Sequence, residues 1–394
     1  MFKKSGETET GFFARNKTLM AISTLMGTVI GAGILAIPYV VSQSGFLFGL
    51  IIIIGLGLAL LLINLMIGEI VLRTKEQHQL TGYAGKYLGR WGQRLMMFSM
   101  VFSIYGALTA YLIGEGETLK AIFKIGTPLM YSLIFFMITF FIIYKGIKAA
   151  GKVEMILIGG LLFIVFLIGI YSYDKIDLGN LDSYSWTKFF VPYGVILFAL
   201  MGFPAVPQLQ EVLEHKKQQM RKAIMIGSLI PIFIYILFAF IVIGIIGLQN
   251  FELLQPNERI ATVALSIYSS PILGIFANIV AVLAMFTSFL TLGIALKQMY
   301  EYDYHFSKNT ALFLTLSVPL LITALNLSTF ITVIAVTGAV AGGLEGILII
   351  FTFWKARLLG DRKPEFLLGQ YKTLGMILNL LFGLGILLEL ITLF

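Results

Sequence analysis

The stretch that decides the fold lies inside the first hydrophobic block and reads Gly27-Thr28-Val29-Ile30-Gly31-Ala32-Gly33-Ile34-Leu35-Ala36-Ile37-Pro38. Relative to Ala, each Gly costs about 1 kcal/mol in a helix interior and Pro costs about 3 kcal/mol, so this stretch weakens a helix. Inside a membrane, the freed backbone groups cannot face lipid and must face protein or a wet cavity. A second interpretation stays open, because Gly27 and Gly31 are also spaced as in a motif for close helix packing.

Hydrophobic blocks long enough to cross a bilayer follow this stretch. The chain has 394 residues, of which 58% are hydrophobic and 12% are charged, whereas soluble domains carry about 25% charged residues. A membrane-spanning helix needs about 20 predominantly apolar residues. We therefore predict an all-α integral membrane protein with eleven spans, at about 18–43, 46–72, 95–124, 128–147, 153–173, 189–213, 221–248, 260–297, 310–327, 329–355 and 370–393. The span at 260–297 exceeds one crossing and is expected to protrude.

The positions of the basic residues predict the orientation. Short loops on the cytoplasmic side of a membrane are enriched in Lys and Arg. With the N-terminus inside, 23 of the 28 Lys and Arg fall in inner segments and 5 fall in outer ones. The sequence thus predicts a cytoplasmic segment at 1–17, an outside C-terminus and a place in the cell membrane. No cleavable signal peptide is expected.

A second interruption favours the broken-helix interpretation. The sixth span contains Phe198-Ala199-Leu200-Met201-Gly202-Phe203-Pro204-Ala205-Val206-Pro207. Five spans separate the starts of the two interrupted spans, and because five is odd, they begin on opposite sides of the membrane. Interrupted helices at matching positions of two oppositely oriented units indicate the midplane site of a secondary transporter. The core at 18–355 then holds repeats at about 18–173 and 189–355, and the eleventh span lies outside them.

Broken helices suit a zwitterionic ligand. The N–H end of a half-helix carries a positive partial charge and suits a carboxylate, whereas the carbonyl end suits an ammonium group or a metal cation. An amino acid presents both charges on neighbouring atoms. Neither interrupted stretch contains a charged side chain, and none is required for such a ligand.

The first span also carries a family resemblance. Gly27 to Leu35, followed by Pro38-Tyr39 and Gly45, resembles the N-terminal signature of the amino acid/auxin permease branch of the amino acid–polyamine–organocation superfamily. The resemblance covers essentially the whole chain. It implies the leucine-transporter fold, in which two inverted five-helix repeats, with discontinuous helices 1 and 6, work by alternating access.

The resemblance also implies a substrate site. Main-chain amides at Gly31, Ala32 and Gly33 would hold the carboxylate of the substrate. Carbonyls would accept from its ammonium group at Val29, Phe198, Ala199 and Met201. Further wall positions would be Thr28, Ser288, the aromatic residues Phe198 and Phe203, and Tyr111, for which ordinary packing is an equal alternative.

A cation site is expected beside the substrate. Ala284, Thr287 and Ser288 share one helix face and offer a carbonyl and two hydroxyls. Together with the carbonyls of Gly27 and Ile30 they resemble the site of sodium-coupled members of the fold, a set of oxygens suited to a small hard cation. The alternative is that the two hydroxyls simply bond to carbonyls one turn back.

These features predict a symporter for neutral, apolar or aromatic amino acids, coupled to Na⁺. Pro204 stands where some relatives have a Glu, so a cationic substrate is not favoured. Proton coupling is the first alternative, although Leu161 stands where some proton-coupled relatives carry a Lys. A non-transporting amino acid receptor of the germinant type is the second. The expected partners are the amino acid and the lipid bilayer, with no nucleic acid, no cofactor other than Na⁺, and a monomeric state.

The remaining polar residues receive weaker interpretations. The three His lie in predicted cytoplasmic loops without metal-site spacing, so an enzyme is not expected. Glu69 and Glu154 are expected to be structural or gating groups at the cytoplasmic side. Glu345 could relay protons or form a pair inside the bundle, since intramembrane acids are functional candidates. Glu115 and Glu117 are expected to face water at the outer end of the third span.

Overall fold

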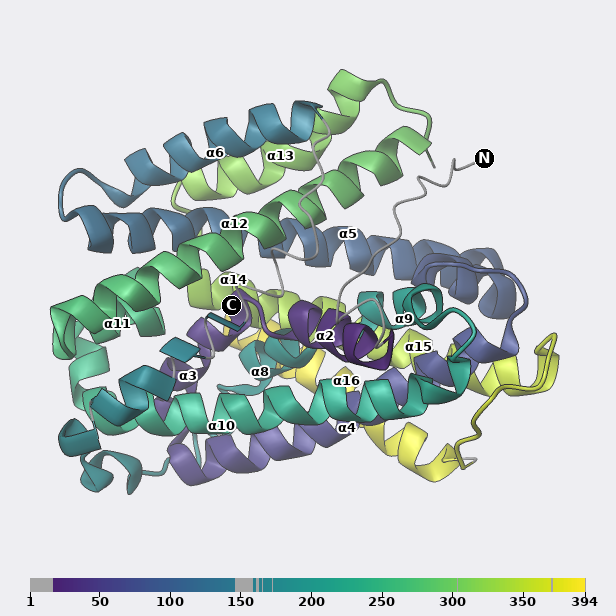
Figure 1. The fold of residues 1–394 in the computed structure, drawn as a ribbon, viewed down its shortest axis with the longest axis horizontal. Helices are drawn as coiled ribbons and strands as arrows, with labels where there is room; N and C mark the ends of the chain where they lie inside the picture. Colours follow the sequence, from purple (N-terminus) through teal and green to yellow (C-terminus); the bar gives the residue numbers. More distant parts are fainter. Residues whose placement is uncertain are drawn as a thin grey trace.

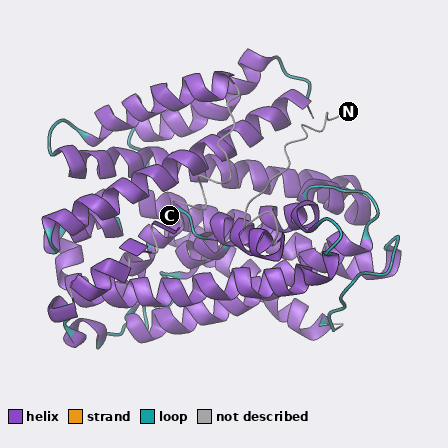
Figure 2. Ribbon diagram, viewed as in Figure 1, coloured by secondary structure: helices purple, strands orange, loops and turns teal. Residues whose placement is uncertain are grey.

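The computed structural model describes residues 17–145, 159–160, 163–164, 166–171, 173–302, 304–369 and 371–393. The described chain is helical throughout (Figure 2). Its long helices are α4 (Phe46–Arg73), α5 (Leu80–Phe123), α6 (Pro128–Lys145), α10 (Met220–Leu253), α12 (Pro271–Tyr302), α13 (Lys308–Ala324), α15 (Gly343–Leu359) and α16 (Lys372–Leu393). Many large apolar side chains on these helices are exposed, Leu58, Ile138 and Phe233 among them, as expected for surfaces that face lipid.

Both predicted breaks are present in the structure. The first span divides into α2 (Lys17–Val29), the 3-10 helix η1 (Ala32–Leu35) and α3 (Ile37–Ser44). The sixth divides into α8 (Tyr193–Leu200), the 3-10 helix η4 (Phe203–Ala205) and α9 (Val206–Leu213). These short pieces lie in the middle of the molecule, between a layer with α6, α12 and α13 and a layer with α10 and α4 (Figure 1).

The structure departs from the predicted spans in two places. The predicted span 260–297 is wrong as a single helix, because α11 (Ala261–Tyr268) ends at the extended Ser269 before α12 begins. The third helix starts at Leu80, earlier than predicted, and contains a kink at Gly89, where φ is 75°. Most of the fifth predicted span, 153–173, lies outside the described residues, as do segment 1–16, Glu154 and Leu161. Eight described helices are long and apolar enough to cross a membrane.

The tenth span also changes its winding near the centre. It consists of α14 (Phe330–Thr337), a π-helical turn at Gly338–Gly342 and α15. A methyl group on Gly338 would lie 2.0 Å from the carbonyl oxygen of Gly194. The missing side chain therefore lets the tenth span approach α8 just before the second break.

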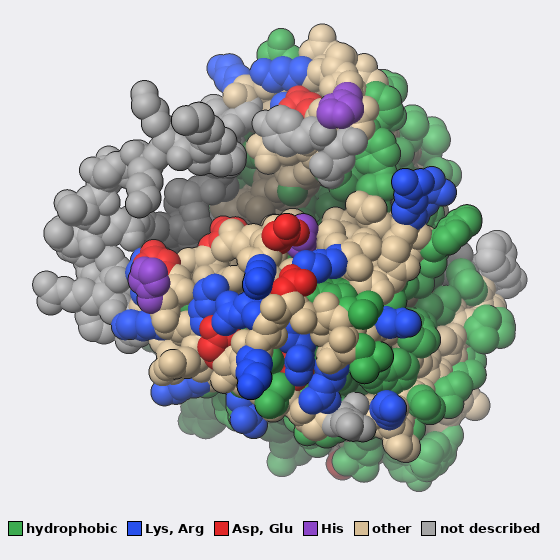
Figure 3. All heavy atoms as spheres, turned by 90° about the vertical axis from the view of Figure 1, so that its right-hand side faces the viewer, with side chains coloured by type: hydrophobic (Ala, Val, Ile, Leu, Met, Phe, Trp, Pro, Cys, Tyr) green, Lys and Arg blue, Asp and Glu red, His purple; other side chains and the backbone are tan. Residues whose placement is uncertain are grey.

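The two ends of the helix bundle differ in charge. One end, called the inner end after the predicted orientation, carries Lys86, Arg357 and Asp361, and basic side chains gather there (Figure 3). The opposite end, called the outer end, carries Lys188 and Arg259. This segregation agrees with the counts on which the orientation prediction rests, and the orientation itself stays a prediction.

Candidate functional site

The two breaks touch each other directly. A methyl group on Gly33 would lie 2.7 Å from the Cα of Ala199 and 3.2 Å from the ring of Phe198. A methyl group on Gly202 would lie 2.9 Å from the side chain of Val29. Real Cβ atoms do not approach backbone carbon so closely. Glycine is therefore required at position 33, where backbone lies opposite, whereas a side chain at position 202 would displace the ends of neighbouring side chains; the close approach at Gly33 brings the backbones of the two broken helices together.

Gly31 leaves more space than Gly33. Its backbone is extended, and a methyl group there would lie 3.9 Å from the Tyr111 hydroxyl, an ordinary contact distance. Its N–H donates to the Val29 carbonyl at 3.0 Å. The next two N–H groups, at Ala32 and Gly33, open a helical turn and have no hydrogen-bond partner among the described residues. The predicted carboxylate donors and Tyr111 thus lie around one point.

Tyr235 joins the two breaks from α10. Its side chain is fully buried, and its hydroxyl lies 2.7 Å from the Val29 carbonyl oxygen and 2.9 Å from that of Ala199. The hydroxyl has one proton, so the two carbonyls share it. Sequence reasoning missed this residue, although a single phenol inside the uncharged block 223–251 was the available signal.

The predicted ammonium acceptors meet near Tyr235, and most already accept from the protein. The Val29 carbonyl receives the Tyr235 hydroxyl and the Gly31 N–H, while Ala199 receives the same hydroxyl. The Phe198 carbonyl receives the Met201 N–H at 3.2 Å. A bound ammonium group would therefore have to share or displace these donors.

The predicted side-chain wall is partly closed. Phe198 is half-buried beside Gly33 and Gly338, and Met201 is half-buried against Gly342. Phe203 is fully buried, so it lines no open space in this conformation. By contrast, Thr28 is exposed although it lies near the middle of the first span.

The predicted ligands of the cation lie on two segments, the first span and α12, which pack mainly against different helices. α2, with Gly27, packs mainly on α10 and α9, whereas α12 packs mainly on α5. The Thr287 hydroxyl donates to the carbonyls of Leu283 at 3.2 Å and Ala284 at 3.1 Å, as in the backbone-bonding alternative. Ser288 is half-buried. Among the described residues, no cluster of His, Asp and Glu could hold a metal ion.

A clamp at the outer end holds α3 in place. Arg259, which ends the 3-10 helix η6 (Pro256–Arg259), donates to the Tyr39 hydroxyl at 2.8 Å and stacks 4.9 Å above the same ring. The Arg259 side chain also donates to the carbonyls of Phe251 and Leu254. Next to the clamp, the Asn257 side chain accepts from the N–H of Phe330 at the start of α14. This end is therefore closed over the breaks.

Of the acidic residues near the membrane ends, Glu69 agrees with its prediction as a structural or gating group, whereas Glu115 and Glu117 do not agree with theirs. Glu69 is fully buried at the inner end, where it pairs with Arg73 at 2.9 Å and Arg357 at 3.4 Å and accepts from the Leu368 N–H. It is a structural group in this conformation. Glu115 and Glu117, by contrast, were expected to face water, and that prediction is wrong because their side chains are 0% and 8% exposed.

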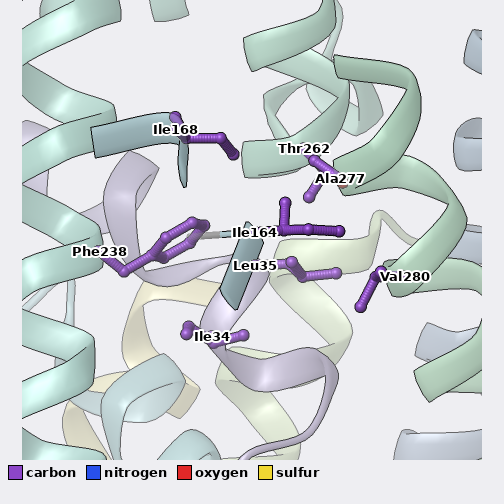
Figure 4. A pocket seen from close by; sticks show the side chains of 8 residues that line it. All are labelled: Ile34, Leu35, Ile164, Ile168, Phe238, Thr262, Ala277 and Val280. Atoms are coloured by element: carbon purple, nitrogen blue, oxygen red, sulfur yellow. The ribbon is translucent and has the colours of Figure 1, made fainter. Parts of the chain in front are cut away.

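A small cavity lies beside η1 (Figure 4). Its volume is about 10 Å³, near the smallest that holds one water molecule. Its one polar lining side chain is Thr262, whose buried hydroxyl has no hydrogen-bond partner. The lining residues are Ile34, Leu35, Ile164, Ile168, Phe238, Thr262, Ala277 and Val280. This cavity is too small for an amino acid.

Comparisons with known proteins agree with this geometry. The chain is 26% identical to the tyrosine-specific transport system 1 of Haemophilus influenzae over 93% of this chain and 94% of that protein. It is 24% identical to glutamine transporter 2 of Aliivibrio fischeri over 83% and 84% of the two chains. A crystal structure of MhsT in complex with L-phenylalanine superimposes with a TM-score of 0.65 at 17% identity, covering 98% of this chain and 99% of that one. The predicted leucine-transporter fold is confirmed.

A family model also matches most of the chain. The model describes the tryptophan/tyrosine permease family and matches residues 14–391. Together with the membrane-spanning helices, this match identifies a multi-span membrane transport protein and confirms that the chain is not an enzyme. The chain belongs to the tryptophan/tyrosine permease family.

Proposed function

We propose that this protein is a secondary transporter that moves aromatic amino acids across the cell membrane by symport with Na⁺. The observation that carries the proposal is the contact between the two breaks. It places the unpaired N–H groups of Ala32 and Gly33, the Tyr111 hydroxyl and the carbonyl of Ala199 around one point. Such a point offers donors for a carboxylate and acceptors for an ammonium group.

The substrate proposed is a neutral amino acid with an aromatic side chain. No charged side chain lies in either break, so a charged substrate side chain would have no counter-charge there. Phe198 and Tyr111 are aromatic groups beside the first break: a methyl group would lie 3.2 Å from the Phe198 ring if added to Gly33, and 3.9 Å from the Tyr111 hydroxyl if added to Gly31. The family and the tyrosine-specific relative point to the same class. The finer resemblance to the amino acid/auxin permease branch is part of this proposal.

Alternating access follows from the contrast between the two ends. The outer end is closed by Arg259 and Tyr39. On the inner side of the break, Thr28 is exposed. The described conformation therefore corresponds to the state that receives or releases substrate at the inner end. A second conformation would release the outer clamp and cover Thr28.

The proposed Na⁺ site would form when α2 moves toward α12. The break leaves oxygen atoms available there. In an unbroken helix the Gly27 carbonyl would accept from the N–H of Gly31, but that N–H donates to Val29 instead. The Thr287 hydroxyl donates its proton to a carbonyl and keeps lone pairs for a cation. Gly27, Ile30, Ala284, Thr287 and Ser288 remain the proposed ligands.

Uptake into proteoliposomes tests this function. Labelled tyrosine, tryptophan, phenylalanine and glutamine are offered with sodium and proton gradients imposed separately. We expect aromatic substrates to accumulate with Na⁺. The variant Gly31→Leu should lose binding and uptake, while the matched control Gly55→Leu keeps both, because a methyl group on Gly55 meets no atom within 4 Å. Binding without accumulation under any gradient would contradict transport and favour a receptor.

A paired substitution tests the Na⁺ site. Thr287→Ala combined with Ser288→Ala should remove the sodium dependence of uptake. Thr352→Ala is a matched control, because its hydroxyl also bonds one turn back, to the Leu348 carbonyl, but on α15. Wild-type uptake that is indifferent to sodium would contradict the coupling part of the proposal alone.

A further inference from the structure

Glu115 is a buried acid that the proposed site does not use. It lies in α5, its side chain is 0% exposed, and neither carboxyl oxygen has a hydrogen-bond partner. Among the described residues, no charged group pairs with it. The charged groups at the same end of the molecule are engaged elsewhere or lie nearer the surface, namely Glu117, Lys120, Glu258 and Arg259. On the neighbouring helices α6 and α12, the charged residues Lys145, Lys297 and Glu301 lie at the inner end.

Two glycines flank Glu115 and allow the neighbouring helices to pack closely around it. Glu115 stands between Gly114 and Gly116. A methyl group on Gly114 would lie 2.8 Å from the sulfur of Met285 on α12, and one on Gly116 would lie 2.2 Å from the Ser132 hydroxyl on α6. Because neither glycine has a side chain, α12 and α6 press close to α5 on both sides of the carboxyl group.

Glu115 lies between the outer end and the substrate site. It is four residues after Tyr111, so the two side chains share one helix face, and side chains on a helix lean toward its N-terminus. The carboxyl group therefore leans toward the turn that holds Tyr111. It lies eight residues before α5 ends at Phe123, which is about 12 Å along the axis. A path from the outer end to Gly31 along this face passes Glu115.

The missing partners determine the protonation state. Burying an ionised carboxylate without hydrogen bonds or a counter-charge costs a large desolvation free energy. Burying the neutral acid costs much less desolvation free energy. The outer end can therefore close over Glu115 when its carboxylate has taken up a proton. The desolvation cost opposes closure over the ionised carboxylate. This requirement links occlusion to one proton.

We propose that Glu115 carries a coupling proton, an inference that rests on the transport function proposed above. With the outer end open, the carboxylate binds a proton from the outer water and becomes a neutral acid. The clamp then closes over it. When water enters from the inner end through the substrate site, the acid releases the proton there, and the carboxylate is restored as the outer end opens. One proton crosses in each cycle, in addition to the proposed Na⁺.

Glu345 is the rival acid, and its surroundings favour it less. It is 1% exposed and one of its oxygens has no partner. Its neighbours Gly343 and Gly346 pack against Ile386 and Phe382 of α16. Because α16 lies outside the two repeats, Glu345 borders a peripheral helix, whereas Glu115 shares a helix face with Tyr111.

The test measures tyrosine and protons together in proteoliposomes that hold the same Na⁺ concentration inside and outside, so that the proposed Na⁺ site is filled and no sodium gradient drives uptake. A pH-sensitive dye inside the vesicles reports proton entry, and an inward gradient of about one pH unit supports up to about tenfold accumulation with one proton per substrate. We expect wild-type protein to acidify the lumen as tyrosine enters. Glu115→Gln should lose acidification and accumulation but keep tyrosine exchange without a gradient. Glu115→Asp should keep all three, and Glu389→Gln, a half-buried acid on α16, is the matched control.

Several outcomes would overturn the inference. These are a Glu115→Gln variant that still acidifies the lumen, a Glu115→Asp variant that takes up tyrosine without moving protons, and a loss confined to Glu345→Gln. Wild-type net uptake of tyrosine without any proton entry would refute the role of Glu115 and leave the transport function standing. Wild-type protein that exchanges no amino acid would refute the proposed function and this inference with it.

Discussion

The two halves of the first broken helix meet the rest of the molecule in different ways. The outer half, α3, is held by the Tyr39 clamp, by the bond from the Ser185 N–H to the Ser44 carbonyl and by the bond from Lys188 to Gln43. Among the described residues, the inner half, α2, has an ion pair near its start, between Lys17 and Glu214, whose partners are both partly exposed, and its last residue, Val29, accepts from Tyr235. The difference indicates that polar contacts at its far end hold the outer half, whereas the inner half is held mainly by packing on α10 and α9 and by the Tyr235 bond next to the break.

The contact that joins the halves should give the largest effect. Gly33→Val places a side chain against the Ala199 backbone, 2.7 Å from where its Cβ would stand. Overpacking costs about 1 to 3 kcal/mol even where side chains can adjust, and here backbone must shift. We expect uptake to fall by about a hundredfold or more, together with a lower melting temperature in detergent.

Gly31→Ala is the matched control for this variant. It adds a methyl group at an ordinary distance of 3.9 Å from the Tyr111 hydroxyl, so the protein should stay folded. Substrate affinity should then change more than stability. Equal losses of stability in the Gly33 and Gly31 variants would contradict the assigned contact between the breaks.

The breaks were predictable because they depend on local backbone preferences. Three Gly and a Pro in the first span weaken any helix, whatever packs against it, and the Gly202 and Pro204 positions do the same in the sixth. The partners of Tyr235 and Arg259 were not predictable, because they are backbone carbonyls and a phenol that become neighbours when α10 and η6 dock.

The wrong prediction for Glu115 has a similar cause. Its position near the end of a hydrophobic block suggested contact with water, since the sequence does not show which loops or helices cover that end. The burial arises from close packing at the two flanking glycines. The sequence Gly114-Glu115-Gly116 was the local signal, and it gains its meaning from α6 and α12.

The hydroxyl that ties the two breaks should give an intermediate effect. Tyr235→Phe removes one donor shared by the Val29 and Ala199 carbonyls and keeps the packed ring. The Val29 carbonyl keeps the Gly31 N–H, but the Ala199 carbonyl loses its donor; leaving one buried acceptor unpaired costs about 1 to 3 kcal/mol, and 1.4 kcal/mol corresponds to a factor of ten. We expect transport to fall by about tenfold, with weaker coupling between substrate and Na⁺ binding. Unchanged uptake and affinity would show that the carbonyls do not depend on this donor.

The substitutions with the smallest expected effects compare the two halves of the first broken helix most directly. The chain has no Cys, so Thr28→Cys provides a single thiol that reports access from the inner end. Arg259→Gln in this background removes a cation–π contact worth about 0.5 to 2 kcal/mol, so the outer end opens more often and inner labelling should slow by several-fold.

Lys17→Gln removes an exposed ion pair and should change labelling by less than about twofold. The Lys17 ammonium lowers the pKa of Glu214, so the pair persists from neutral pH downward until that lowered pKa is reached. The contrast between the two variants should therefore be the same at pH 6 and pH 8, and faster labelling in Arg259→Gln would mean that the outer clamp does not hold this conformation.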